Sequence, residues 1–278
     1  MPSPPLRGLL LASFAFAPPV LAAPAAPFGA LDTTYGYTEL ADLTLAARLI
    51  VAADILRATA LKDAAAAGVP PGYARYYVEA TTRALIAGVG PLPATVRYLT
   101  DLPTARGKPR LKGVPVLLLA APTARSGDLR LVSPRAQVPR TAENEARVRA
   151  IALAALAPDA PPAIIGIGHA FHVAGSLPGE GETQIFLRTA DDRPISLSIL
   201  RRPGEAPRWA VALSELVDAS ATPPSADSLL RYRLACGLPR TLPDSAVESL
   251  AAADAEQARA DYRIVLDGVG NCDRRTAG

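Results

Sequence analysis

The sequence predicts an α+β fold in which a small antiparallel β-barrel is followed by an antiparallel β-meander with helices. Three observations lead to this prediction. Five short segments between residues 37 and 139 have the pattern of strands, and a capped helical pattern covers residues 141–157. Three apolar runs between residues 183 and 213 are then separated by turn residues.

The barrel is expected over residues 37–139. A short helix should begin near Thr38, which caps it, and should end near Ala47. The clearest strand covers residues 75–86, because apolar and polar residues alternate there as they do in a half-buried strand. Further strands are expected at residues 48–61, 94–102 and 114–120, with a weaker one at 128–132.

A connecting helix within residues 140–160 separates the barrel from a second domain, residues 161–278. Thr141 is expected to cap this helix and Pro158 to stop it. In the second domain, the apolar segment 163–174 precedes three strands at residues 183–189, 194–201 and 208–213, and helices follow at 226–235 and 245–266. The side chains expected to face its core are Ile185, Leu187, Ile195, Leu197, Ile199, Trp209, Val211 and Leu213.

The first 22 residues have the pattern of a cleavable export signal. Arg7 precedes an apolar run of about ten residues, which is too short to cross a bilayer, and Ala22 provides a small side chain at the cleavage position. Residues 23–36 are rich in alanine, proline and glycine and are expected to be flexible. We expect a periplasmic or secreted protein with no stable membrane insertion after cleavage near Ala22.

The protein has two cysteines, Cys236 and Cys272, and only one pairing is possible. In an oxidising compartment a structural disulfide is expected, and it would stabilise the fold by roughly 3 to 4 kcal/mol on the chain-entropy model. Free thiols are the alternative. The spacing differs from a C-x-x-C redox pair, and no histidine lies nearby in the sequence.

The composition and the motifs exclude several classes of function. The formal net charge is only +3, so nucleic acid is not an expected partner. Gly166 and Gly168 lack the third glycine of a dinucleotide fingerprint, and Gly107-Lys108 lacks the phosphate-loop frame. Ser176 is not in a G-x-S-x-G elbow, and no serine lies three residues before a lysine. We therefore expect no cofactor.

One segment, residues 166–183, carries the candidate chemistry, because it holds both histidines and two carboxylates: His169, His172, Glu180 and Glu182. Imidazole and carboxylate groups are suitable zinc ligands. If the segment is a strand, however, the two histidines are three residues apart and point to opposite faces. Structural histidines are the alternative interpretation. Two other hypotheses use Ser176 as a nucleophile, or the glutamates as the carboxylate pair of a glycoside hydrolase.

Two resemblances are visible. The segments RLIVAADILRATAL, YYVEATTRALIAG and ATVRYLTDLP resemble the hydrophobic pattern of netrin-like and other OB-type barrels. That resemblance implies an OB-like barrel and raises the possibility of a proteinase-inhibitor-like function. The segments GHAFHVAGSLPGEGETQIFL and RPGEAPRWAVALSE resemble a group of exported alphaproteobacterial proteins. This second resemblance implies a compartment and no activity.

The function expected from these observations is a non-enzymatic binding or interaction module of the cell envelope. Its partner would be an envelope protein or a small ligand. The alternatives are an exported hydrolase or metal-dependent enzyme centred on the segment from His169 to Glu182, and a proteinase-inhibitor-like barrel.

Overall fold

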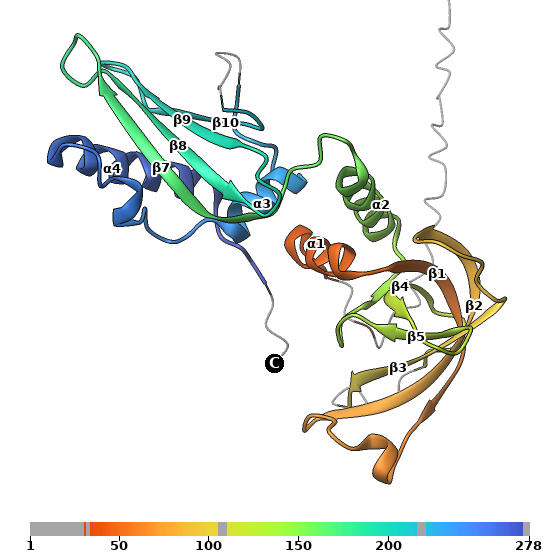
Figure 1. Ribbon diagram of the computed structural model, residues 1–278. Helices are drawn as coiled ribbons and strands as arrows, with labels where there is room; N and C mark the ends of the chain where they lie inside the picture. The colour runs from red at the N-terminus through yellow and green to blue at the C-terminus, as the bar shows by residue number, and fades with distance from the viewer. Residues whose placement is uncertain (1–30, 32–33, 105–109, 216–220, 275–278) are drawn as a thin grey trace, which may run out of the picture.

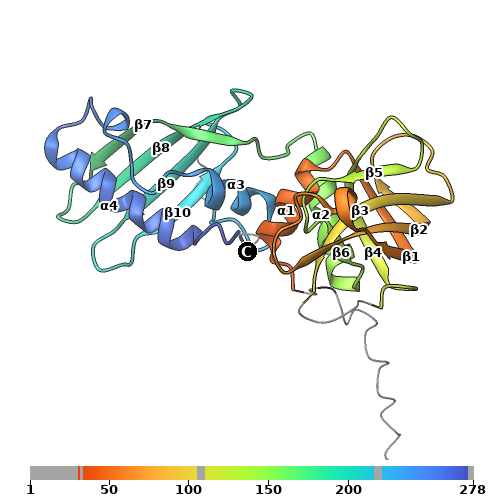
Figure 2. The ribbon, with the colours of Figure 1, turned by 90° about the horizontal axis from the view of Figure 1, so that it is seen from below.

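The computed structural model describes residue 31 and residues 34–104, 110–215 and 221–274. A closed β-barrel and an open four-stranded sheet lie side by side, with three helices between them (Figures 1 and 2). The fold class is thus α+β, with an OB-like barrel first and a β-meander with helices second, as the sequence predicts.

The barrel consists of strands β1 (Leu49–Ala60), β2 (Tyr73–Ala87), β3 (Thr95–Pro103), β4 (Pro115–Pro122) and β5 (Asp128–Leu131). They pair in the order β1-β2-β3-β5-β4, and β1 closes the barrel by pairing with β4. Strand β6 (Gln137–Pro139) adds to β4, and the short helix η1 (Asp63–Ala66) joins β1 to β2. The prediction of a purely antiparallel barrel is corrected in one respect, because β3 and β5 are parallel.

The first part of strand β1, from Leu49 to Ala53, is buried on both faces, which explains its apolar sequence. Val51, Ala53 and Ile55 face the barrel core. Ile50 and Ala52, which alternate with them, pack instead against the helices outside the barrel. Strand β1 therefore contributes side chains to two apolar cores, one inside the barrel and one between the barrel and the helices.

That second core is built on helices α1 (Tyr37–Ala46), α2 (Ala142–Leu156) and α3 (Leu229–Gly237). The Thr141 side chain caps α2 by accepting a hydrogen bond from the backbone N–H of Asn144, as predicted. Tyr232 of α3 donates a hydrogen bond to Asp42 of α1. These contacts join the C-terminal half to the helices beside the barrel.

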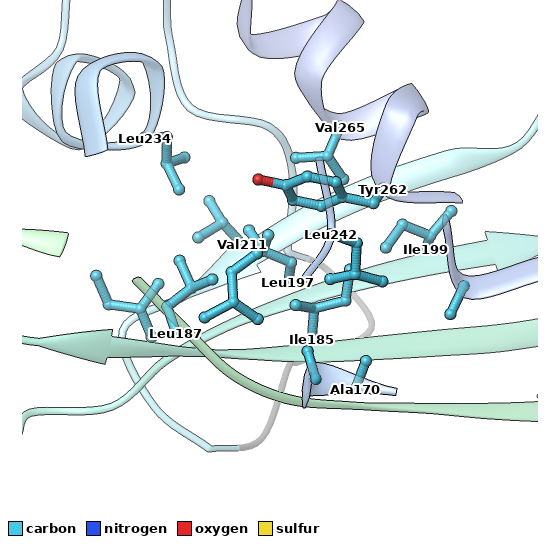
Figure 3. Close-up of a cluster of buried hydrophobic side chains, with 14 of the residues drawn as sticks. Ala170, Ile185, Leu187, Leu197, Ile199, Val211, Leu234, Leu242, Tyr262 and Val265 are labelled. Atoms are coloured by element: carbon cyan, nitrogen blue, oxygen red, sulfur yellow. The ribbon is translucent and has the colours of Figure 1, made fainter. Parts of the chain in front are cut away.

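The sheet of the C-terminal half is a meander of β7 (Ile164–Ala174), β8 (Gly181–Thr189), β9 (Ile195–Arg201) and β10 (Arg208–Ala212). Helix α4 (Ala252–Val269) covers one face of this sheet. The short helix η2 (Asp244–Ala246) contacts the edge strand β7. The predicted inward residues face this core, where Tyr262 and Val265 of α4 lie over Ile185 and Leu197 (Figure 3). Leu213 is the exception, since it follows the end of β10 and is exposed.

The predicted disulfide is confirmed. Cys236 and Cys272 are bonded with an S–S distance of 2.13 Å, and the bond ties the end of α3 to the segment that follows α4.

The N-terminal predictions fall mostly outside the described residues, which include neither residues 1–22 nor residues 23–30. Within the segment expected to be flexible, Leu31 and Tyr35 are instead buried, because they pack into the barrel core and the helical core. In the part of the chain that the structure describes, no helix is long and apolar enough to cross a membrane.

Candidate functional site

The structure places the two histidines on opposite faces of strand β7. His169 lies on the outer face, opposite Phe186 in the strand register, and its ring stacks on that phenyl ring with centroids 4.7 Å apart. His172 lies on the inner face, where its Nδ1 is 2.9 Å from the hydroxyl of Thr183. The two histidines are three positions apart in an extended strand, so their imidazoles point in opposite directions.

The two glutamates lie on the outer side of the same sheet. Glu182 accepts hydrogen bonds from Gln184 and from Ser198 of β9, and Glu180 in the β7–β8 turn accepts one from the backbone N–H of Leu177. Both glutamates line a shallow groove of about 620 Å³. The other lining residues are Phe171, Val173, Ala174, Gly175, Ser176, Gly181, Gln184 and Leu200.

The four predicted site residues are therefore only partly brought together. Glu180 and Glu182 share a groove, His169 lies on the same face of the sheet, and His172 lies on the other face. Among the described residues, no group of three or more histidine, cysteine, aspartate or glutamate side chains is arranged to hold a metal ion. In this geometry the two histidines cannot ligate one zinc ion, which argues against the zinc hypothesis.

A buried polar network behind the sheet was missed by the sequence analysis. Asp261 of α4 is fully buried and accepts hydrogen bonds from the Thr183 hydroxyl and from the Arg201 guanidinium. Gln257 donates a further hydrogen bond to the same carboxylate. The available signal was the position of Asp261, which is three residues after the buried Ala258 and so belongs to the inward stripe of the helix.

A larger groove, of about 660 Å³, opens in the wall of the barrel. We call it the barrel groove. It is lined by Arg75, Tyr77, Arg97–Asp101, Thr123 and Asp128–Pro134.

The barrel groove exists because β3 and β5 pair over a short distance only. Their parallel pairing comprises Arg97 with Asp128 and Tyr98 with Leu129. Strand β3 then continues to Pro103 along β2, whereas the chain after β5 follows β4, with Val132 donating a hydrogen bond to the Leu119 carbonyl. The barrel wall therefore opens between the two diverging segments.

Charged side chains lie at the rim of this groove. Arg75 makes a bidentate ion pair with Asp101, with both N···O distances 2.8 Å, and this hydrogen bonding raises the pKa of the Arg75 guanidinium. Arg97 pairs with Asp128 at 2.7 Å. Arg130 is exposed and makes no ion pair with any described residue, so the rim carries one uncompensated positive charge.

Tyr98 and Thr100, which are among the lining residues, have buried polar groups. Tyr98 donates a hydrogen bond of 2.8 Å to Oε1 of Gln137, and burial raises the pKa of the Tyr98 phenol. The Thr100 hydroxyl and the Gln137 amide nitrogen are also buried, but neither has a hydrogen-bond partner among the described residues. Buried polar groups without partners are rare in folded proteins, and each one requires an explanation.

The sequence analysis also missed Thr100 as a candidate. Its signal was its place in the alternation of β3, where Val96, Tyr98, Thr100 and Leu102 all point inward and all four are buried. Thr100 is a hydroxyl residue in a row that is otherwise suited to a hydrophobic core. Such a polar residue on the inward face of a strand is a sign of a binding site or of a buried hydrogen bond.

No protein-family model matches this chain, and no curated protein matches it either. By its fold, the chain is an α+β protein with an OB-like barrel and a helix-covered meander, and its surface has two grooves.

Proposed function

We propose that the protein is an exported ligand-binding module of the cell envelope and that the barrel groove is its binding site. One observation carries the proposal: the groove is lined largely by apolar atoms and has a buried, unpartnered hydroxyl, that of Thr100, in its lining. Binding sites typically combine an apolar surface with a few polar groups that orient the ligand. The Thr100 hydroxyl has almost no accessible surface, so a bound ligand would supply its missing partner only by displacing the side chains that cover it.

The rim of the groove supports the same proposal. The ion pairs Arg75–Asp101 and Arg97–Asp128 hold their side chains in place before any ligand arrives. Ordered side chains lose little conformational entropy on binding, which favours affinity. The arrangement is that of a pre-formed site.

Fragment screening by NMR tests the binding proposal. The purified 15N-labelled protein is titrated with a library of small apolar and polar fragments, and the amide resonances that shift are mapped. We expect the shifts to cluster at Leu99, Thr100 and Leu129. Leu99→Glu should abolish them because Leu99, which is 48% exposed, lines the groove.

A matched control separates a local from a general effect. Leu156→Glu changes a leucine that is also exposed, but on helix α2, and should leave the fragment shifts unchanged. Shifts that map elsewhere, or that survive Leu99→Glu, would show that the barrel groove is not the binding site.

The proposed compartment rests on the export pattern of residues 1–22 and is consistent with the bond between Cys236 and Cys272. Mass spectrometry of the protein from fractionated cells tests it. We expect a mature N-terminus at Ala23 in the envelope or culture fluid. An intact Met1 terminus on cytosolic protein with both thiols reduced would contradict export.

A further inference from the structure

We infer that the ligand of the barrel groove is an extended peptide that adds as a strand to the free edge of β3. This inference rests on the proposed function and goes further, because it names the class of ligand and the mode of binding. It starts from the backbone of β3 rather than from its side chains.

The edge of β3 from Leu99 to Pro103 has no neighbouring strand among the described residues, since the pairing with β5 ends at Tyr98. The direction of its backbone groups follows from two hydrogen bonds. The N–H of Arg97 donates to the carbonyl of Gly127 on the β5 side, and the N–H of Thr104 donates to Gly72 on the β2 side. Alternate residues therefore face alternate sides.

By this alternation, the N–H and carbonyl of Asp101 face the groove. Strand β2 leads to the same conclusion. Its residue Arg75, the partner of Asp101 in the register, directs its carbonyl away from β3 and accepts a hydrogen bond from the N–H of Leu61. Asp101 thus belongs to a pair that is not hydrogen-bonded across β2 and β3. Its backbone donor and acceptor are directed to the place that a further strand would take.

A strand in that place would satisfy the buried polar group as well. Side chains of a strand alternate between its two faces, so every second side chain of the bound peptide would enter the opening between β3 and the segment after β5. There it would lie against the apolar side chains of Leu129 and Leu131, and it would reach the Thr100 hydroxyl by displacing the side chains that cover it. The intervening side chains would lie outside, beside Leu99.

The charge at the rim favours a peptide with an acidic residue. The arginines Arg75 and Arg97 are neutralised by their aspartate partners, whereas no described residue neutralises Arg130. A carboxylate on one of the outward positions of the peptide would pair with Arg130. An unsubstituted lipid chain would leave the β3 backbone unpaired, and a nucleic acid strand would not match its alternating donors and acceptors.

The test uses a phage-displayed library of random dodecapeptides, selected against the purified protein. Selected peptides are synthesised, their affinities are measured by calorimetry, and each backbone N–H is then replaced in turn by N-methyl. Strand addition predicts a periodic result: methylation at alternate residues should weaken binding about tenfold, and methylation at the residues between them about twofold or less.

Variants of the protein complete the test. Thr100→Val and Arg130→Ala should each weaken binding several-fold. Arg208→Ala should not, because Arg208 is also exposed and has no ion pair with a described residue, but lies on the distant strand β10. Amide exchange at Asp101 should slow when the peptide binds. That slowing reports a new backbone hydrogen bond and does not depend on side-chain contacts.

Three results would overturn the inference. Peptides could bind without any alternation in the N-methyl series, which would exclude strand addition. The library could yield no binder although fragments bind at Leu99, which would leave the proposed function intact and exclude a peptide ligand. Finally, oligothymidine or dodecanoate, measured in parallel, could bind the groove more tightly than any selected peptide, which would assign it to another class of ligand.

Discussion

The hydroxyl of Thr183, on strand β8, donates a hydrogen bond to the carboxylate of Asp261, which lies 78 residues later on helix α4. Both residues have no exposed surface. The same carboxylate accepts a hydrogen bond from Arg201, so a complete polar network fixes α4 on the sheet. In the barrel, by contrast, the buried hydroxyl of Thr100 has no partner among the described residues.

The contrast between these two threonines makes the first prediction. Thr100→Val removes an unsatisfied buried hydroxyl and should stabilise the ligand-free protein by about 1 kcal/mol, because the desolvation cost of that group disappears. Thr183→Val removes a hydroxyl that bonds to His172 and Asp261 and should destabilise by about 2 kcal/mol. Urea unfolding of the two variants measures both effects. Equal destabilisation by both would show that Thr100 has a partner in the folded protein.

The second prediction concerns the carboxylate of the network. Asp261→Asn removes the buried negative charge and leaves Arg201 without an ion pair, so the free energy of unfolding should fall by about 3 kcal/mol. The control is Asp244→Asn, which breaks an ion pair with Arg259 at an almost fully exposed carboxylate and should cost well under 1 kcal/mol. Similar losses in the two variants would mean that burial does not strengthen the Asp261 pair.

The third prediction concerns the disulfide. In the double variant Cys236→Ser, Cys272→Ser, the free energy of unfolding should fall by about 3 kcal/mol, because the disulfide lowers the conformational entropy of the unfolded chain. The wild-type protein unfolded in the presence of a reductant should show the same loss, and the reductant should not affect the double variant. A wild-type protein unaffected by complete reduction would contradict this account.

The fourth prediction addresses the metal hypothesis. Since His169 and His172 lie on opposite faces of β7, the purified protein should contain no stoichiometric zinc. Elemental analysis of the wild type and of His169→Ala and His172→Ala measures this directly. About one zinc per chain in the wild type, lost in both variants, would require a rearrangement of β7 and would restore the enzyme hypothesis.

Much of the fold could be predicted because strand and helix patterns are local. The alternation in β2, the cap at Thr141 and the inward residues of β8 and β9 were all visible in the sequence. The alternation also led to the expectation that His169 and His172 diverge if their segment is a strand. The pairing of β3 with β5 was not predictable, because strand order depends on contacts between distant segments.

The candidate site was harder to predict for the same reason. The barrel groove results from the end of a strand pairing after Tyr98, which no local pattern records. The network of Thr183 and Asp261 joins residues far apart in the chain, and neither residue type is distinctive by itself. The segment 166–183 attracted attention because its residues are chemically versatile, yet the structure places them on two faces of one sheet.

Site-specific photo-crosslinking tests the central claim most directly. A benzophenone amino acid is introduced at Leu99 in the barrel groove or, as a control, at Leu156 on α2, and the two proteins are irradiated in the cells that produce them. The account predicts a discrete crosslinked product from position 99 that is absent from position 156 and is lost when Arg130→Ala and Thr100→Val are added. No product at position 99, or the same products at both positions, would contradict a ligand site in the barrel groove.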